Sequence, residues 1–164
     1  MAVALNGTTN HNAAVTVTNA AYTAAELATI NNGTAGAITL NTTNTALSGT
    51  AASLAAAFAG TVTEHTGTVT ITDANYTVAQ LKTINAGTTG SITLNTTNVP
   101  LSGSSSDLAA AFAGTVTEHT GGVTITNADY TVTELKAINA GTTGAITLNT
   151  TNTCLLYTSP SPRD

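Results

Sequence analysis

This 164-residue chain has few of the side chains that usually carry binding or chemistry. Charged residues make up 7 % of it, aromatic residues 4 %, and tryptophan is absent, whereas soluble domains average about 25 % charged residues. Three Lys and Arg stand against eight Asp and Glu, which gives a formal net charge of −5. Because the basic surface that nucleic acids and anionic membranes attract is missing, we expect neither as a partner.

Long apolar runs and cysteine are scarce as well. No stretch of about 20 apolar residues exists that could cross a bilayer, so we expect no membrane insertion. Met1 to Asn10 have neither the basic region nor the apolar core of a signal peptide. Cys154 is the single cysteine, and its position near the C-terminus leaves the rest of the chain cysteine-free, which fits an oxidising exterior.

Threonine, alanine and asparagine fill the chain instead, and they are arranged in a repeat. Ala55 to Gly60 recurs unchanged at Ala109 to Gly114, and Thr61 to Gly67 recurs at Thr115 to Gly121. Both segments return after 54 positions. Self-similarity at a fixed period is the signature of a repeat architecture, in which each unit buries its apolar face against its neighbours.

Each period divides into a shorter unit of 23 positions and a longer unit of 31, and each unit is read as one strand and one helix. Val69 to Thr72 alternates apolar and hydroxyl residues, Ile92 to Leu94 begins the next unit, and Val123 begins the one after it. Apolar residues three apart predict short helices over 24–31, 78–85 and 132–139, with Thr77 as a cap and Gly87 as a stop. In the longer unit, Ser104 and Asp107 resemble a capping box, and the helix ends at Gly114 or continues to His119.

The alternation decides the fold class. Successive strand side chains point to opposite faces, so a sheet whose strands alternate valine or isoleucine with threonine is covered on one side only. We therefore predict an α/β solenoid of right-handed strand–helix repeats, with one parallel sheet covered by helices on one face only. Residues 1–153 would form this single domain, with a curved, concave threonine face. Tyr22, Tyr76 and Tyr130 would wedge the interior with their hydroxyls outward.

The exposed face of this sheet is the candidate binding surface. Its hydroxyls and amides would stack in two parallel ranks, and this pattern resembles the Thr-x-Thr faces of ice-binding solenoids. The alternative is that threonine is frequent there because it is a good strand former on a solvent-exposed face. The predicted surface ladder comprises Thr16, Thr18, Thr39, Asn41, Thr70, Thr72, Thr93, Asn95, Thr124, Thr126, Thr147 and Asn149.

Other polar motifs predict no chemistry. Glu64-His65 and Glu118-His119 are the only repeating acid–imidazole pairs, and adjacent residues do not face each other, so we interpret them as solvated bends. Asp73-Ala74-Asn75 and Asn127-Ala128-Asp129 each supply too few carboxylates for calcium and are better explained by Asx-turns. We expect no catalytic residues, no metal ligands, no cofactor and no enzymatic activity.

The whole repeat, with segments such as Tyr130 to Lys136, resembles the Thr/Ala/Asn-rich repeats of large secreted or surface bacterial proteins, adhesin-like and haemolysin-type chains among them. The resemblance implies an extracellular or cell-surface location and a spacer or adhesive role. The alternatives are ice or ordered-surface binding through the ladder, and carbohydrate binding on the concave face. The scarcity of aromatic rings argues against the carbohydrate hypothesis. End-to-end self-association is a further expectation.

The last eleven residues, 154–164, do not continue the repeat. They resemble translated sequencing-adapter read-through, and the alternative is a natural disordered tail. Neither origin makes them part of the predicted domain.

Overall fold

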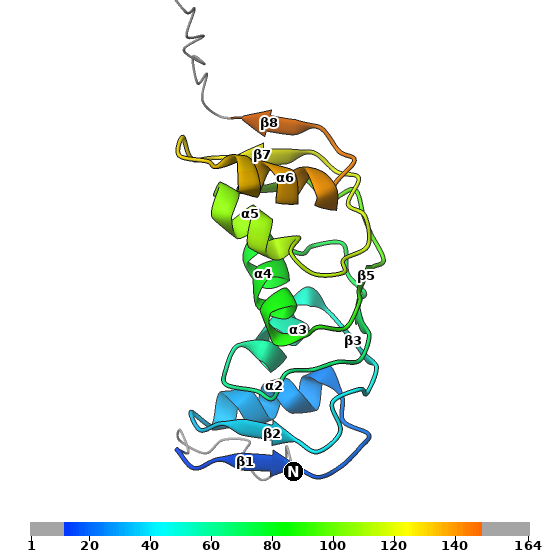
Figure 1. Ribbon diagram of the computed structural model, residues 1–164. Coiled ribbons are helices and arrows are strands. Elements are labelled where there is room, and N and C mark those ends of the chain that lie inside the picture. The colour runs from blue at the N-terminus through cyan, green and yellow to red at the C-terminus, as the bar shows by residue number, and fades with distance from the viewer. Residues whose placement is uncertain (1–11, 149–164) are drawn as a thin grey trace, which may run out of the picture.

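The computed structural model describes residues 12–148, which form an α/β protein; Asn149 and the 154–164 tail lie outside the described residues. Helices stack one above the other in chain order along the molecule (Figure 1), and each packs against the next. The elements are β1 (Val15–Val17), α2 (Ala24–Gly33), β2 (Ile38–Leu40), β3 (Leu47–Gly49), α3 (Ala51–Phe58), β4 (Val69–Ile71), α4 (Val78–Gly87), β5 (Ile92–Leu94), β6 (Leu101–Gly103), α5 (Ser105–Ala111), β7 (Val123–Ile125), α6 (Val132–Gly141) and β8 (Ile146–Leu148).

All the strand pairs of the described residues are parallel, but they form three sheets and not the single sheet that we predicted. The strand orders are β1-β2, β3-β4-β5 and β6-β7-β8. In β1-β2, β4-β5 and β7-β8 the apolar residues of the two strands stand opposite each other. In the other two pairs Gly49 and Gly103 stand opposite Ile71 and Ile125. The alternation is confirmed, because Val15 and Val17 of β1 are buried while Thr16 between them is exposed.

The division into three sheets comes from short strands that the sequence pattern did not predict, β3 and β6. We call one circuit that brings the chain back beside itself a coil. The coil that begins with β5 also contains β6; β5 pairs with β4 of the coil before it, and β6 pairs with β7 of the coil after it. Within one coil, the strand that pairs with the coil before is therefore different from the strand that pairs with the coil after. On the far side of β5, only the single bridge between Ile92 and Val116 connects it to the following coil.

The same geometry rules out one of the two alternatives for the longer unit, the helix that continues to His119. Its circuit closes at the bridge between Ile92 and Val116, only one position later than a shorter unit would close. The chain then runs along the preceding coil before β7 begins, and the backbone N–H of Thr120 donates to the Thr97 carbonyl there. The helix ends early, since α5 stops at Ala111. The extra residues thus form an extended segment and not an additional helical turn.

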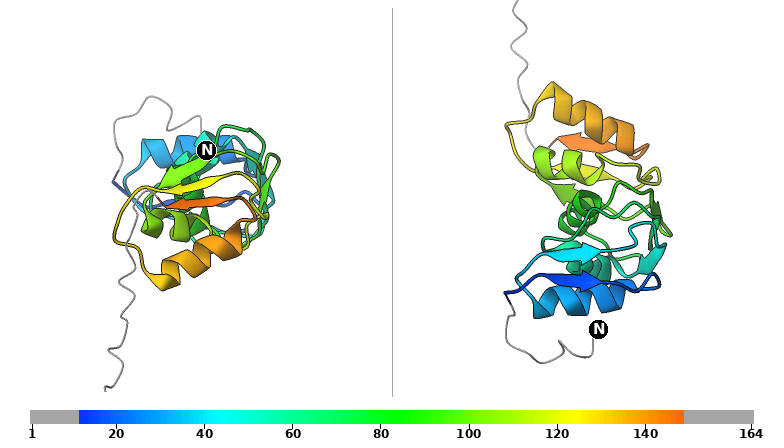
Figure 2. Two further views of the ribbon diagram at one scale, coloured as in Figure 1. Left: turned by 90° about the horizontal axis from the view of Figure 1, so that it is seen from above. Right: turned by 60° about the horizontal axis from the view of Figure 1, so that its bottom comes forward.

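The strand face turns around the column of helices. Helix α2 lies behind β1 and β2 in Figure 1, whereas α6 lies in front of β7 and β8, and the views in Figure 2 agree. Parallel strands twist in one sense, so a stack of short sheets accumulates rotation. The single concave threonine face that we predicted is therefore replaced by three short faces that point in different directions.

Capping explains where the helices begin. Thr77 is the N-cap of α4, as predicted, and its side chain accepts from the backbone N–H of Gln80 while the Gln80 side chain accepts from the Thr77 backbone. The same reciprocal box starts α2 and α6. Helix α4 ends at Gly87, which it includes as its last residue, two positions beyond the predicted 78–85, and Thr88 follows in extended conformation. A Cβ on Gly87 would lie 2.5 Å from the Phe58 ring, so glycine is needed there for close packing.

We expect Thr77→Ala to lower the free energy of unfolding by about 1 kcal/mol, because the first turn of α4 loses both hydrogen bonds of the Thr77 hydroxyl, one accepted from the Gln80 backbone N–H and one donated to Gln80 Oε1. Urea unfolding of the full chain measures this change. Thr77→Ser keeps the hydroxyl and should retain most of the stability. An alanine variant as stable as the parent would show that the box contributes nothing.

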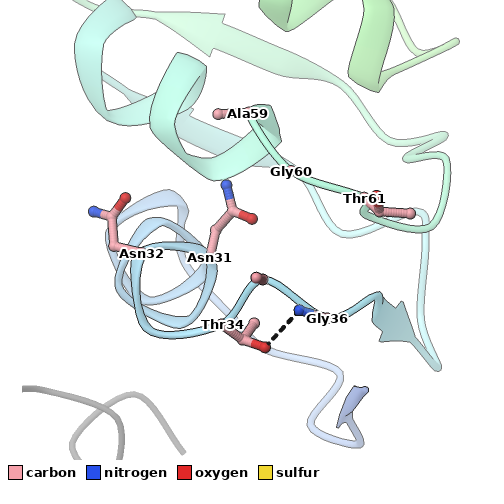
Figure 3. Close-up of a pocket in the computed structure, with 8 residues that line it drawn as sticks. Asn31, Asn32, Thr34, Gly36, Ala59, Gly60 and Thr61 are labelled. Atoms are coloured by element: carbon pink, nitrogen blue, oxygen red, sulfur yellow. Dashed lines mark hydrogen bonds between the residues drawn. The ribbon is translucent and has the colours of Figure 1, made fainter. Parts of the chain in front are cut away.

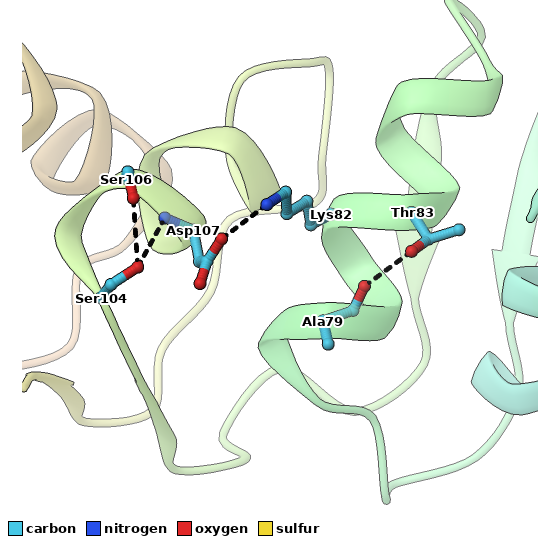
Figure 4. Close-up of polar contacts among 6 residues, drawn as sticks. All are labelled: Ala79, Lys82, Thr83, Ser104, Ser106 and Asp107. Carbon is cyan, nitrogen blue, oxygen red and sulfur yellow. Dashed lines mark hydrogen bonds and ion pairs between the residues drawn. The ribbon is translucent and has the colours of Figure 1, made fainter.

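The predicted capping box at Ser104 is only half formed. Ser104 Oγ accepts from the Asp107 backbone N–H at 3.2 Å, but the Asp107 carboxylate accepts from Lys82 Nζ at 2.6 Å (Figure 4). A carboxylate turned toward a cation on α4 does not reach back to its own N-cap. The residue that the pattern assigned to a local motif therefore joins two successive helices.

The tyrosine hydroxyls also point the other way from our prediction. Tyr22 and Tyr76 are buried, and their hydroxyls donate at 2.7 Å to the carbonyls of Thr42 and Thr96 in the following coil. Burial raises the pKa of Tyr76 to about 12. These hydroxyls are inside because each satisfies a carbonyl of the next layer of chain.

Candidate functional site

Two buried histidines form the most distinctive polar clusters of the described residues. His65 and His119 are both 0 % exposed, which corrects our interpretation of them as solvated bends. His65 Nε2 lies 2.7 Å from the Thr45 carbonyl, and its Nδ1 lies 3.2 Å from Thr88 Oγ1. His119 repeats this geometry with Val99 and Thr142, at 2.8 and 3.3 Å.

Each histidine joins the coil before it to the coil after it. The partner of His65 Nε2 lies in the preceding layer of chain, and the partner of its Nδ1 lies in the following one. Thr88 Oγ1 also donates to the His65 carbonyl at 2.9 Å. Because a carbonyl can only accept, Nε2 carries a proton and donates. The two nitrogens of one imidazole thus connect its own layer of chain to the layer before it and to the layer after it.

Aromatic packing completes each cluster. The Phe58 ring centroid lies 5.7 Å from that of His65, and the Phe112 ring stands at the same distance from His119. Burial lowers the pKa of both imidazoles, and the hydrogen bond to the carbonyl acts in the opposite direction. The neutral imidazole is therefore the form that the fold favours.

This pKa shift predicts loss of stability in mild acid. The folded-state pKa of each histidine lies below the ordinary value of 6.5, so the unfolded chain binds protons more readily as the pH falls through that value. The stabilisation is complete above pH 6.5 and declines below it until the folded-state pKa is reached, by at most about 1.4 kcal/mol per pH unit for each histidine. Urea unfolding between about pH 8 and pH 5 measures it. A flat profile in the parent, or one that His119→Gln leaves unchanged, would contradict the prediction.

The predicted ladder is present only as short columns. Thr16 stands opposite Thr39, Thr70 opposite Thr93, and Thr124 opposite Thr147. Ser48 and Ser102, which the pattern did not include, extend the second and third columns. The second rank follows the strand ends, where Thr18, Thr72, Thr126, Asn41 and Asn95 are exposed; Asn149 lies outside the described residues.

Backbone hydrogen bonds interrupt the ladder between the sheets. Beyond Thr39 the next hydroxyl is that of Thr63, which donates to the Ile38 carbonyl at 3.3 Å and accepts from the Leu40 N–H at 3.2 Å. Thr117 does the same beyond Thr93, at Ile92 and Leu94. These hydroxyls replace backbone partners where the strand pairing stops, so the columns do not join into one surface.

The side chains that we predicted to form Asx-turns bond mainly to the preceding coil and only in part to their own loop. Asp73 Oδ1 accepts from the Ala51 N–H at the start of α3, 2.9 Å away and one coil earlier. Asn127 Oδ1 accepts from the Ser105 N–H at the start of α5, while its Nδ2 donates to the nearby Asp129 carbonyl. Only this last contact is local. The side chains bind helix N-termini of the preceding coil, where free N–H groups need acceptors.

One groove is polar and uncharged. It has a volume of about 580 Å³ and is lined by the ends of α2 and α3 with the turns that follow them (Figure 3). Asn31 donates to the Ala56 carbonyl at 2.7 Å, and Thr34 accepts from the Gly36 N–H at 2.9 Å. No ionisable side chain of the described residues lines this groove, so it offers neither an acid nor a base to a substrate.

Residues 12–148 contain no group of three or more His, Cys, Asp or Glu side chains placed to hold a metal ion. Within the same part of the chain, no helix combines the length and the apolar character that crossing a bilayer requires.

The sequence contains a signal for the histidine clusters, which is an interval between residues and not a local motif. The interval from His65 to Thr88 is the same as that from His119 to Thr142, and His11 is followed by Thr34 at this interval too. A fixed His-to-Thr interval equal to one coil predicts contact between layers. A comparison of adjacent residues such as Glu64 and His65 does not contain this signal.

No protein-family model matches the chain, and neither a curated protein nor a solved structure matches it.

Proposed function

We propose that this chain is a non-enzymatic structural repeat module, a spacer with an adhesive role in an extracellular or cell-surface protein, built as an α/β solenoid. The observation that carries the proposal is how its polar side chains are used. Histidine, tyrosine, asparagine and threonine groups that could act on a ligand are hydrogen-bonded between one coil and the next. A module whose role is mechanical uses its polar groups in this way.

The pattern of packing supports the solenoid. Helices pack in sequence order, α2 on α3, α3 on α4, α4 on α5 and α5 on α6, and paired strands belong to successive coils. Such a stack is stabilised approximately as a sum of units and nearest-neighbour interfaces. Added units would lengthen the molecule without changing its cross-section, which is the geometric requirement for a spacer.

The chemistry of the described residues favours a structural role over catalysis. Both histidines of the described residues are buried, and both of their nitrogens have protein partners. Glu26 and Glu134 are engaged in capping boxes, and Asp107 is paired with Lys82. A general base needs access to a substrate proton, and these groups are occupied within the fold.

Rigidity along the stack tests the proposal. Spin labels on Thr16→Cys of β1 and Thr147→Cys of β8, in the full chain carrying Cys154→Ser, allow the distance between the two ends to be measured by electron–electron double resonance. We expect one narrow distance distribution, because each coil is hydrogen-bonded to the next. A broad distribution would contradict a spacer role. The singly labelled variants Thr16→Cys and Thr147→Cys, whose continuous-wave spectra report label mobility, are the matched controls.

Ice or ordered-surface binding is the second candidate, and the in-register hydroxyl columns are the observation that favours it. The columns Ser48–Thr70–Thr93 and Ser102–Thr124–Thr147 space hydroxyls at the repeat of parallel strands, about 4.8 Å. Thermal hysteresis of the full chain tests it, with Thr70→Val and Thr93→Val as variants. Activity that these variants abolish would support this candidate over the spacer.

A further inference from the structure

One face of the molecule has the same sequence pattern as an interface inside the stack, but its apolar side chains are exposed. Helix α6 and strand β8 correspond, residue for residue in the repeat, to α4 and β5. Val132 is 68 % exposed and Leu148 42 %, whereas their counterparts Val78 and Leu94 are 6 % and 4 % exposed. Together with Leu135 and Ile146 they line an apolar groove of about 480 Å³. We call it the α6–β8 face.

The internal copies show what covers such a face. Over α4 the cover is β6 with α5: a Cβ on Gly103 would lie 3.4 Å from Val78, so the strand passes close to the helix. Lys82 Nζ binds Asp107 Oδ1 of α5 at 2.6 Å (Figure 4). Asn85 Nδ2 donates to the Ala110 carbonyl at 2.8 Å.

A second internal copy agrees. Over α2 the cover is β3 with α3, and a Cβ on Gly49 would lie 3.4 Å from Ala24. Asn31 Nδ2 donates to the Ala56 carbonyl at 2.7 Å. In both copies the covering segment is Leu-Ser-Gly followed by a Ser- or Thr-capped, alanine-rich helix.

The polar groups that hold this cover are also present on the α6–β8 face. Lys136 and Asn139 stand where α4 has Lys82 and Asn85. Both are exposed, and neither side chain has a hydrogen bond or ion pair among the described residues. An apolar groove flanked by a cation and an amide donor therefore matches a partner helix in chemistry as well as in shape.

We propose that the α6–β8 face binds one strand–helix segment with the chemistry of residues 95–121: an extended Leu-Ser-Gly, then a capped alanine-rich helix with aspartate at its third position. The segment's helix packs on α6 and its strand crosses close to Val132. Its aspartate pairs with Lys136, and the carbonyl that corresponds to that of Ala110 accepts from Asn139. The inference rests on the internal copies and does not depend on the extracellular location or the spacer role of the proposed function.

The first arm of the test is in trans. A fluorescein-labelled peptide of residues 95–121 is titrated with the full chain, and we expect saturable binding. Val132→Asp in the chain should weaken it at least tenfold, because the equivalent side chain is buried in the internal copy. Thr133→Asp, an exposed neighbour outside the groove, is the matched control. Asp107→Lys in the peptide should weaken binding a few-fold, and Lys136→Glu in the chain should restore it.

The second arm supplies the segment in cis and decides the matter. Residues 154–164 are replaced by a copy of residues 100–121, so that 149–153 lead into it as 95–99 do. We expect amide exchange of Leu135 and Lys136 to slow at least tenfold relative to the parent. Unchanged exchange overturns the proposal whatever the peptide does. Self-association that Val132→Asp abolishes and the peptide does not compete would also overturn it, in favour of a second copy as the occupant.

Discussion

Replacing His119 with alanine is expected to lower the free energy of unfolding by about 2–5 kcal/mol. The side chain is fully buried, so its loss leaves a cavity beside Phe112, whose ring centroid lies 5.7 Å away. The substitution also leaves the Val99 carbonyl without the imidazole donor, and an unsatisfied buried polar group costs about 1–3 kcal/mol. Equilibrium unfolding in urea under mildly alkaline conditions, where the imidazole is neutral, measures the change.

Two variants separate the imidazole from its surroundings. Glu118→Ala changes the residue next to it, which lies outside the buried core, and should alter stability by less than about 0.5 kcal/mol. His119→Gln retains an N–H group near the Val99 carbonyl and should recover part of the loss. If His119→Ala proved no more destabilising than Glu118→Ala, the histidine would not be joining the coils.

The second large effect is expected at Gly121. A Cβ there would lie 2.5 Å from the Val99 carbonyl oxygen and 2.7 Å from the Asn98 carbonyl carbon. Both are backbone atoms of the preceding coil, so the clash can be relieved only by moving the coils apart. We expect Gly121→Ala to cost about 3 kcal/mol or more, at the upper end of overpacking effects. Thermal unfolding of the full chain would show it as a lower Tm.

Gly122 gives a control one residue away. The nearest atom to a Cβ at that position is 3.9 Å distant, and the equivalent position in the preceding repeat is Thr68. Gly122→Ala should therefore be neutral or raise stability by about 0.4–1 kcal/mol through the unfolded state. Equal destabilisation by both substitutions would show that close approach of the coils is not what requires glycine at Gly121.

The elements with a strong local pattern could be predicted from the sequence. The alternation in Val69 to Ile71 identified β4, because one strand face is buried and the other is wet. The Thr77 cap placed the start of α4 correctly, since capping depends on residues three apart. These features are set within a few residues of chain, so a single sequence contains them.

Features that depend on the next coil could not be found from local patterns. Strand β6 has one buried residue, Leu101, followed by an exposed serine and a half-buried glycine, so no alternation marks it. Its pairing with β7 is what splits the sheet. Asp107 looked like a capping residue and binds Lys82 because α4 lies beside it. In each case the partner belongs to another coil, far away along the chain.

The threonine ladder shows both situations. The register that places Thr70 opposite Thr93 follows from the alternation, because a slip by one residue would expose the apolar set. The interruption at Thr117 does not, because its hydroxyl is held by the Ile92 carbonyl and the Leu94 N–H. A threonine on a strand face and a threonine that substitutes for backbone pairing look the same in sequence.

The state of the imidazole protons is the most direct test of the claim that buried histidines join successive coils. In nitrogen-15-labelled full chain under mildly alkaline conditions, we expect slowly exchanging Nε2–H signals for His65 and His119, with nuclear Overhauser contacts from His119 to Val99 and Thr142. The contacts follow from hydrogen-bond distances of 2.8 and 3.3 Å. Rapidly exchanging imidazole protons without contacts to residues one coil away would contradict the account.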